Sequence, residues 1–429
     1  MKHKKNISKI STRKKYLIFL ITLSIFCLSF ISFYAAKRII YQKNKEAFIK
    51  RTIAAMTLPE KAAQIFVIGL TVYDNGQFYG VAELNPRVEE QIKRYQVGGV
   101  ILFTKNLVSI KQTKKLIADL QESVKIPMFI CIDEEGAISR LAKKPEFHST
   151  KIPEAEILGK EGDKNLTYKI GVILGRELSS LGINMNFAPV ADLKIFSDSA
   201  IQTRSFGSNP ALVSLMVKVF VKSLQSQGVS SVVKHFPGYG SSRIDAHVQL
   251  PFVDVDIKTL EKREFLPFRA GINAGVDGVM IAHLKCDDIE QSGVPATFSK
   301  KIVTEILRKK LNFKKLIITD ALDMGAIVNG WSVEETVVLA FLAGSDILLM
   351  PLDFAKAYTA IIEAVRSGKI PEERLNESIK RILDVKYDRI ISKQTLTKNN
   401  LDPEFILGCP EHQQIVEKIN NNKRNKKFQ

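Results

Sequence analysis

The 429-residue sequence is 45% hydrophobic and 25% charged, with 24 Gly, 15 Pro and 4 Cys, a balance that indicates a globular protein and excludes a disordered chain, a collagen-like repeat and a disulfide scaffold. The net charge of +18 lies at the two ends: residues 1–51 hold 13 Lys and Arg against one acid, and residues 418–429 hold 5 without an acid, which leaves +1 for residues 52–417. This nearly neutral body, without a basic patch rich in aromatic residues, argues against nucleic-acid binding.

The first predicted element is a membrane-spanning helix. Residues 16–36 (YLIFLITLSIFCLSFISFYAA) contain no charge and follow a strongly basic start, and 21 residues of helix span roughly 30 Å of hydrocarbon. We therefore expect a basic cytoplasmic N-terminus over 1–15, an uncleaved transmembrane signal anchor over 16–36 and a linker over 37–51. The folded body would then lie outside the cytoplasm, attached to the cell membrane by a single span.

Two alternatives to this anchor remain. A cleaved signal peptide shares the basic start and the apolar run, but bulky Phe33 and Tyr34 stand where the Ala35-Ala36 site needs a small residue. A lipoprotein attached at Cys27 is disfavoured, because Phe26 precedes that cysteine.

The body alternates short apolar runs with amphipathic segments. The runs have the length and the Val, Ile and Leu content of fully buried strands, and they cover 64–70, 99–103, 128–133, 183–189, 229–235, 278–283, 316–320 and 346–350. Helix-like segments between them include 109–123, 166–181, 210–226, 257–274, 299–311 and 332–343. Eight buried strands with intervening helices predict an α/β fold, a (β/α)₈ TIM-type barrel, as a single catalytic domain over 52–392.

An open, doubly wound sheet is the structural alternative. The barrel is favoured because five polar residues follow apolar runs at the end where barrel enzymes collect their active sites; they are Asp133, Lys234, His235, His283 and Asp320. An open sheet would gather its ligand at one switch point. We expect the remaining residues, 393–429, to form a basic, mostly disordered tail. The four cysteines show no metal-ligand spacing.

The stretch over 234–251, KHFPGYGSSRIDAHVQLP, carries the most chemical information. A strand ends in Lys-His, two glycines interrupt the chain, and Asp245 and His247 follow two residues apart. In an extended segment such residues project to one side, so the carboxylate can orient the imidazole toward a substrate as a general acid/base. In an isolated D-x-H pattern the Asp more often caps a turn and the His is more often a surface residue, so this pattern alone does not decide the function.

The motif KHFPG-x-G-x₄-D-x-H resembles the fingerprint of glycoside hydrolase family 3, in its β-N-acetylhexosaminidase branch. Further matching segments occur in order along the chain, and they are IDEEG, NFAPVAD, RSFGSNP, MIAHL, PATFS, ITDALDMGAI and AGSDILLMP. Together they cover essentially all of residues 55–390.

The resemblance implies a (β/α)₈ barrel that hydrolyses terminal β-linked N-acetylglucosamine with retention, through a covalent glycosyl-aspartate. It implies that Asp320 is the nucleophile and that His247 is the acid/base with Asp245 as its partner. Asp192 and His283 fit supporting positions behind the site. By the same similarity five residues would bind the sugar, and they are Asp133, Arg140, Arg204, Lys234 and His235.

The sequence departs from the family pattern at two places. Tyr239 replaces the second His of the usual KHFPGHG. The family's IDQEGGRVQRL reads IDEEGAISRL here, one residue shorter, so that seven residues instead of eight separate Asp133 from Arg140. Arg140 is therefore the least secure of the sugar contacts, and an altered substrate preference is expected.

The leading hypothesis is a membrane-anchored exo-β-N-acetylglucosaminidase that acts on extracytoplasmic glycans such as peptidoglycan fragments. One alternative is the β-glucosidase or β-xylosidase branch of the family, which takes its acid/base from a second domain for which about 40 residues after the barrel leave no room. Another is a non-catalytic glycan-binding surface protein. Acid/base and covalent catalysis by side chains implies no metal and no cofactor, and we expect a monomer with a glycan substrate as its partner.

Overall fold

The structure is a computed structural model that describes residues 12–74, 77–246, 249–392 and 402–427. The chain divides into two units, Met1–Ala55 and Met56–Gln429. Helix α1 (Thr12–Ala55) makes up the described part of the first unit, and the second unit contains every strand.

Helix α1 runs through the segment expected to be a membrane span and through the expected linker. The stretch expected to be a linker, 37–51, is part of this helix. It contains neither Gly nor Pro to interrupt a helical backbone. In the part of the chain that the structure describes, no helix is both long and apolar enough to cross a membrane.

The second unit is built on an eight-stranded parallel sheet in the order β10-β1-β4-β5-β6-β7-β8-β9. An isolated bridge between Ile318 and Ile347 links the two outer strands, so the sheet nearly closes into a barrel. All eight predicted strands are confirmed. They are β1 (Phe66–Gly69), β4 (Gly99–Leu102), β5 (Phe129–Ile132), β6 (Met185–Asn186), β7 (Ser230–Phe236), β8 (Gly278–Ile281), β9 (Leu316–Thr319) and β10 (Leu348–Leu349).

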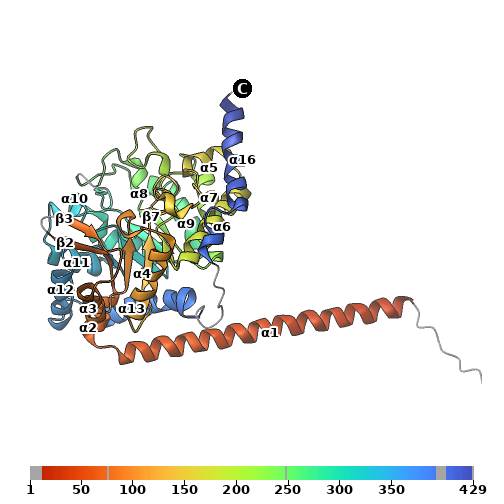
Figure 1. Ribbon diagram of the computed structural model, residues 1–429, viewed down its shortest axis with the longest axis horizontal. Helices are drawn as coiled ribbons and strands as arrows, with labels where there is room; N and C mark the ends of the chain where they lie inside the picture. The colour runs from red at the N-terminus through yellow and green to blue at the C-terminus, as the bar shows by residue number, and fades with distance from the viewer. Residues whose placement is uncertain (1–11, 75–76, 247–248, 393–401, 428–429) are drawn as a thin grey trace, which may run out of the picture. The chain divides into compact units, whose positions relative to one another are not determined.

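Helices surround the barrel (Figure 1). Helices that are near one another in sequence pack side by side, as in the pairs α6–α7, α7–α9 and α11–α12. The main helices around the barrel are α2 (Leu58–Gln64), α3 (Pro86–Tyr95), α4 (Ile110–Glu122), α5 (Ala155–Glu161), α6 (Lys164–Leu181), α7 (Pro210–Ser226), α8 (Ile257–Lys262), α9 (Phe265–Asn273), the π-helical η6 (Lys301–Lys310), α10 (Gly325–Val328), α11 (Val333–Ala343), α12 (Phe354–Arg366) and α13 (Glu372–Lys386). Ser109 and Ser332 start α4 and α11 with capping boxes, which satisfy the free N–H groups of the first turn.

Two local features differ from the sequence-based expectation. The helix predicted over 257–274 is divided into α8 and α9. Pro267 explains this division, since proline has no N–H and is tolerated only in the first turn of a helix, where α9 places it. A hairpin of β2 (Thr71–Asp74) and β3 (Gln77–Gly80) forms a separate two-stranded sheet that was not predicted.

The C-terminal segment is the main correction to the predicted domains. Residues 393–429 were expected to be mostly disordered, yet the structure describes 402–427, with α15 (Pro403–Ile406) and α16 (Pro410–Lys427). The carboxylate of Glu177 on α6 accepts hydrogen bonds from the Gly408 N–H at 3.0 Å and from His412 Nδ1 at 2.9 Å. Burial of Val416 and Ile419 adds apolar contacts, which explains why this segment is ordered despite its charge.

Candidate active site

A cavity of about 760 Å³ opens at the carboxyl ends of the barrel strands. Parallel strands bring their following residues to one rim of a barrel, and for this reason side chains far apart in the sequence meet in this cavity. Seven of the eight predicted site residues line it, and they are Asp133, Arg140, Arg204, Lys234, His235, Asp245 and Asp320.

The eighth predicted residue, His247, lies outside the described residues, as does its neighbour at 248. The chain up to that point is described: Asp245 is exposed, lines the cavity and accepts a hydrogen bond at its carbonyl from the Gln249 N–H at 3.2 Å. The structure thus brings Asp245 into the same cavity as Asp320.

Asp320 directly follows β9, and its backbone N–H donates to the Ile281 carbonyl of the neighbouring strand at 2.9 Å. Burial would raise the pKa of its carboxyl group, but His235, His283 and the N–H of Ala321 lower that pKa overall. The Ala321 N–H donates to Oδ1 at 2.8 Å. Asp320 is therefore an ionised carboxylate at neutral pH, which is the state required of a nucleophile.

Lys234 holds the centre of an ion-pair cluster. Its ammonium group lies 2.7 Å from Asp133 Oδ1 and 2.6 Å from Glu135 Oε1. The Lys234 side chain is only 3% exposed, so these two carboxylates compensate a charge that water hardly reaches. Although burial alone would lower the pKa of Lys234, Asp133 and Glu135 raise it, and the amine stays charged.

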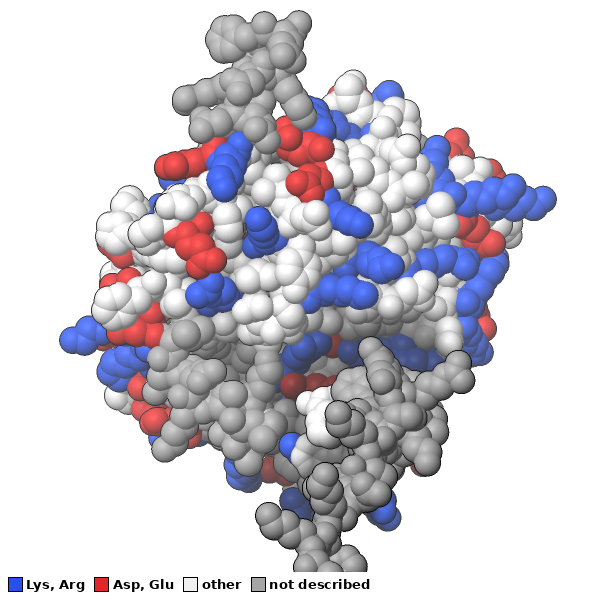
Figure 2. All heavy atoms as spheres, turned by 90° about the vertical axis from the view of Figure 1, so that its right-hand side faces the viewer, with Lys and Arg blue, Asp and Glu red and all other residues white. Residues whose placement is uncertain are grey.

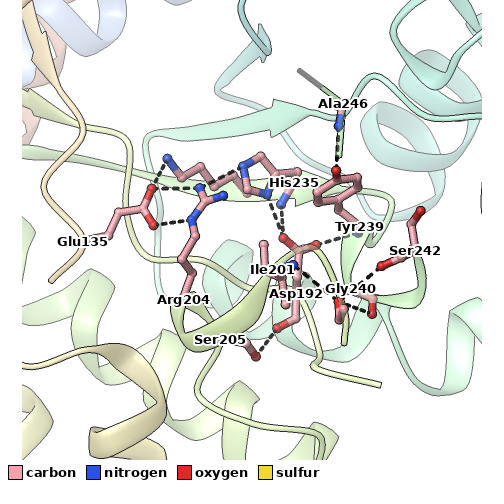
Figure 3. Close-up of polar contacts among 12 residues, drawn as sticks. Glu135, Asp192, Ile201, Arg204, Ser205, His235, Tyr239, Gly240, Ser242 and Ala246 are labelled. Carbon is pink, nitrogen blue, oxygen red and sulfur yellow. Dashed lines mark hydrogen bonds and ion pairs between the residues drawn. The ribbon is translucent and has the colours of Figure 1, made fainter. Parts of the chain in front are cut away.

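Arg204 joins the same cluster from the segment before α7 (Figure 3). Its Nε and Nη2 donate to the two carboxylate oxygens of Glu135 at 2.8 and 2.9 Å. Burial would raise the pKa of Glu135, but Arg204 and Lys234 hold it well below the usual range. Nη2 of Arg204 also lies 3.4 Å from Nε2 of His235. The cations of the cluster thus face the cavity at positions fixed by Glu135.

Asp192 fixes the imidazole of His235. Its Oδ2 accepts hydrogen bonds from the backbone N–H of His235 at 3.0 Å and from the ring Nδ1 at 2.7 Å. Because the carboxylate can only accept, Nδ1 carries a proton and Nε2 is the nitrogen directed elsewhere. The other oxygen of Asp192 accepts from the backbone N–H of Tyr239 at 2.7 Å.

His283 is buried behind Asp320. Its Nε2 lies 2.9 Å from the carbonyl oxygen of Ala321 and its Nδ1 lies 2.6 Å from Oγ1 of Thr297. Burial lowers the pKa of His283, so the neutral ring donates from Nε2 to the carbonyl. The imidazole thereby supports the backbone that carries Asp320.

The shortened loop after β5 still delivers Arg140 to the cavity. Nη2 of Arg140 lies 3.6 Å from Oδ2 of Asp133, and its guanidinium carbon lies 5.2 Å from the ring centre of Phe103. The carboxylate of Glu134 organises the loop, because its Oε2 accepts from the backbone N–H groups of Arg140 at 2.8 Å and of Leu141 at 3.2 Å. The one-residue deletion therefore leaves Arg140 beside Asp133.

Sequence reasoning missed Glu134 and Glu135 as site residues. Both are buried acids directly after β5, and acidic residues are rarely buried without a partner. Their position after a predicted strand, next to Asp133, was the signal that could have identified them. Within the described ranges, no group of three or more His, Cys, Asp or Glu side chains is arranged to hold a metal ion.

One face of the molecule carries side chains of both charges. Figure 2 shows one face of the molecule, where Lys and Arg side chains are interspersed with acidic and uncharged ones. This agrees with the net charge of +1 for residues 52–417. Attraction of a polyanion would require a continuous basic surface instead.

Comparison with known proteins matches residues 57–385 to the family described as Glycosyl hydrolase family 3 N terminal domain. A Beta-hexosaminidase A from Pseudoalteromonas piscicida is 33% identical over 362 residues, which cover 77% of this chain and 59% of that protein. A Beta-hexosaminidase from Nitrosomonas eutropha is 34% identical over 61% of this chain and 75% of its own length. The chain therefore spans about three fifths of the Pseudoalteromonas relative.

The fold is also similar to that of solved structures. A glycoside hydrolase family 3 beta-N-acetylglucosaminidase from Paenibacillus sp. has a TM-score of 0.77 and 35% sequence identity, covering 85% of this chain and 68% of that one. A beta-N-acetylglucosaminidase from Thermotoga maritima has a TM-score of 0.66 and 27% identity, covering 80% and 69% of the two chains.

Proposed function

Because the chain belongs to glycosyl hydrolase family 3, we propose that it is a retaining exo-β-N-acetylglucosaminidase that removes terminal β-linked N-acetylglucosamine from glycans. The observation that carries this proposal is Asp320, with its lowered pKa, in a barrel-mouth cavity that charged side chains line. The names of the relatives from Pseudoalteromonas and Paenibacillus support the same activity.

In the proposed reaction a carboxylate oxygen of Asp320 attacks the anomeric carbon of the sugar. The bond to the leaving oxygen breaks as His247 donates a proton to that oxygen. A water molecule then attacks the anomeric carbon of the glycosyl ester while His247 takes its proton, and Asp320 is released with overall retention. Asp245 orients His247 through its carboxylate, as the D-x-H spacing predicts.

The ion-pair cluster would bind the sugar hydroxyls. Asp133 offers carboxylate acceptors, and Lys234 and Arg204 offer donors whose positions are fixed by Glu135. His235 presents its Nε2, because its Nδ1 proton is bonded to Asp192. Fixed donors lose little entropy on binding and select one orientation of the ring. Arg140 beside Asp133 extends this set.

We also propose that the natural substrates are peptidoglycan fragments. A cavity of about 760 Å³ has room for more than one sugar ring. The experiment is product analysis on muropeptides compared with chitobiose, and release of N-acetylglucosamine from chitobiose alone would refute this choice of substrate.

The location of the enzyme is a further proposal: the body works outside the cytoplasm, at the cell membrane. The sequence supports it through the uncharged run at 16–36 and its basic flank. Protease treatment of intact cells that contain the full chain tests it, since an exposed body would be digested and a cytoplasmic one would survive.

Trapping of the covalent intermediate tests the proposed reaction. A fluorinated N-acetylglucosaminide should add one glycosyl mass to the peptide that contains Asp320, and Asp320→Asn should abolish this adduct. Asp323→Asn is the matched control, because Asp323 lines the same cavity three positions away. An adduct that persists in Asp320→Asn would refute the assignment of the nucleophile.

A further inference from the structure

We propose that Tyr239 is a positioning residue, whose hydroxyl holds the backbone on both sides of Asp245. The inference rests on the proposed function above, in which Asp245 orients the acid/base. Tyr239 stands where the resembled family pattern has His, so the family's motif does not itself give this role to the residue.

The phenol of Tyr239 bridges the two peptide groups that flank Asp245. Its hydroxyl donates to the carbonyl oxygen of Ile244 at 2.5 Å. It accepts from the backbone N–H of Ala246 at 2.9 Å (Figure 3). The direction of both bonds is fixed, because an N–H can only donate and the phenolic proton is then left for the carbonyl. Burial raises the pKa of Tyr239, so the phenol keeps this proton.

Tyr239 is itself held by contacts with Asp192 and His235. Its N–H donates to Oδ1 of Asp192, whose other oxygen holds the ring of His235. The rings of Tyr239 and His235 meet edge to face with centres 5.8 Å apart. Gly240 permits the tight turn that follows, since a Cβ there would lie 1.8 Å from the Leu193 carbonyl oxygen. Asp192 and Tyr239 thus connect the end of β7 to the backbone around Asp245.

The described chain around Asp245 has other contacts besides those of Tyr239: the Ile244 N–H donates to Ser242 Oγ at 3.2 Å, and Arg243 pairs with Asp198 at 3.1 Å. Tyr239 differs from these in bonding the peptide groups on both sides of Asp245. Residues 242–246 form no helix or strand. Ala246 is buried, and its carbonyl accepts from the Ala326 N–H at 3.1 Å. This bond ties the loop to α10, which follows Asp320 closely in sequence. Loss of the phenolic hydroxyl would keep the hydrogen bond between Ala326 and Ala246. It would remove the two hydrogen bonds to the peptide groups that set the orientation of Asp245.

A double-mutant cycle tests this role. Tyr239→Phe removes only the hydroxyl, and it should lower kcat by about 10- to 100-fold for an alkyl N-acetylglucosaminide, because misplacement of a catalytic partner reduces the rate by factors of this size. KM for the alkyl glycoside should stay unchanged. So should kcat/KM for a dinitrophenyl glycoside, because kcat/KM reports only the glycosylation step and this leaving group needs no acid assistance in that step. In an Asp245→Asn background the same change should cost less than about 2-fold, since residues that act as a unit are not additive. Full additivity, or an equal loss on both substrates, would overturn the proposal.

Hydrogen exchange gives a readout that does not depend on turnover. Tyr239→Phe should speed amide exchange in peptides that cover 242–246, while Tyr358→Phe, which removes a hydroxyl in the aromatic cluster of α12, should not. Unchanged exchange in Tyr239→Phe would also overturn the proposal. A wild-type protein that turns over no glycoside would instead refute the proposed function, and the exchange result would still decide whether Tyr239 restrains this loop.

Discussion

Arg204 and Glu135 form a two-point ion pair at the barrel mouth, with Nε–Oε2 and Nη2–Oε1 distances of 2.8 and 2.9 Å. The Glu135 side chain is 2% exposed and also contacts Lys234. One buried carboxylate therefore holds two cations that the proposed reaction assigns to the sugar. Planar two-point pairing fixes both the position and the orientation of the guanidinium.

Glu135→Gln should destabilise the protein and weaken sugar binding. Removal of one charge from a buried pair leaves the partner charges uncompensated, at a cost of about 3 kcal/mol in the free energy of unfolding. Denaturant unfolding and KM for an aryl N-acetylglucosaminide measure the two effects. Since the pKa of Glu135 is lowered in the fold, its stabilisation is present above about pH 4.5 and is lost as the pH falls further. Glu154→Gln, in the same cavity, is the control, and equal losses in both variants would contradict the prediction.

Glu134→Gln should change how stability depends on pH. Burial raises the pKa of Glu134 to about 7, although Ser139 and the N–H groups of Arg140 and Leu141 favour the charged form. The folded state then holds a proton that the unfolded state releases above about pH 4.5, so Glu134 contributes stability below that pH and this contribution is lost as the pH rises through about 7.

The Gln variant should therefore gain about 1–3 kcal/mol relative to wild type between pH 5 and pH 8. Thermal unfolding of both proteins across this range measures the difference. The exposed Glu122→Gln is the control and should show none. A constant difference between wild type and Glu134→Gln would show that Glu134 does not titrate in this range.

Lys386→Met should stabilise the protein near neutral pH. Lys386 lies on α13, fully buried, with Nζ 2.8 Å from Gln64 Oε1 and 5.1 Å from the ring centre of Phe129. Burial lowers its pKa to about 7. The unfolded state therefore binds more protons between about pH 7 and 10.4, and wild-type stability rises with pH over this window.

Methionine has a similar shape and no charge to desolvate, so we expect a gain of about 1–3 kcal/mol at pH 7 after allowing for the lost bond to Gln64. The gain should shrink as the pH approaches 10. Lys380→Met, at an exposed position on the same helix, should change little. A destabilised Lys386→Met protein at pH 7 would show that the bond to Gln64 outweighs the burial of the amine.

Truncation after residue 401 should lower the stability of the barrel. It removes the Gly408 and His412 donors to the buried Glu177 carboxylate and exposes the surface covered by Val416 and Ile419. Loss of these contacts should cost about 2–4 kcal/mol, measured as a lower denaturant midpoint. Truncation after residue 427 is the control. An unchanged midpoint for the shorter chain would mean that α15 and α16 do not stabilise the barrel.

The eight strands could be predicted because they are short apolar runs, most of them buried on both faces, as in β7, where all seven residues are buried. Such a run is visible in the sequence without knowledge of its neighbours. The C-terminal helices could not be predicted in the same way, because their packing depends on hydrogen bonds to Glu177, a residue more than two hundred positions earlier in the chain. The hairpin β2–β3 was missed for the related reason that short strands depend on tertiary contacts.

For the site, the sequence by itself determined which residue types follow the strands and that Asp133, Lys234, His235 and Asp320 share one rim. That result follows from the period and direction of parallel strands, which are local properties of the chain. Only the tertiary structure decided how these charges are paired: Glu135 with Lys234 and Arg204, Asp192 with His235, and Tyr239 with the backbone around Asp245. Ion pairing and burial depend on distances between segments far apart in sequence, and these distances exist only once the barrel has formed.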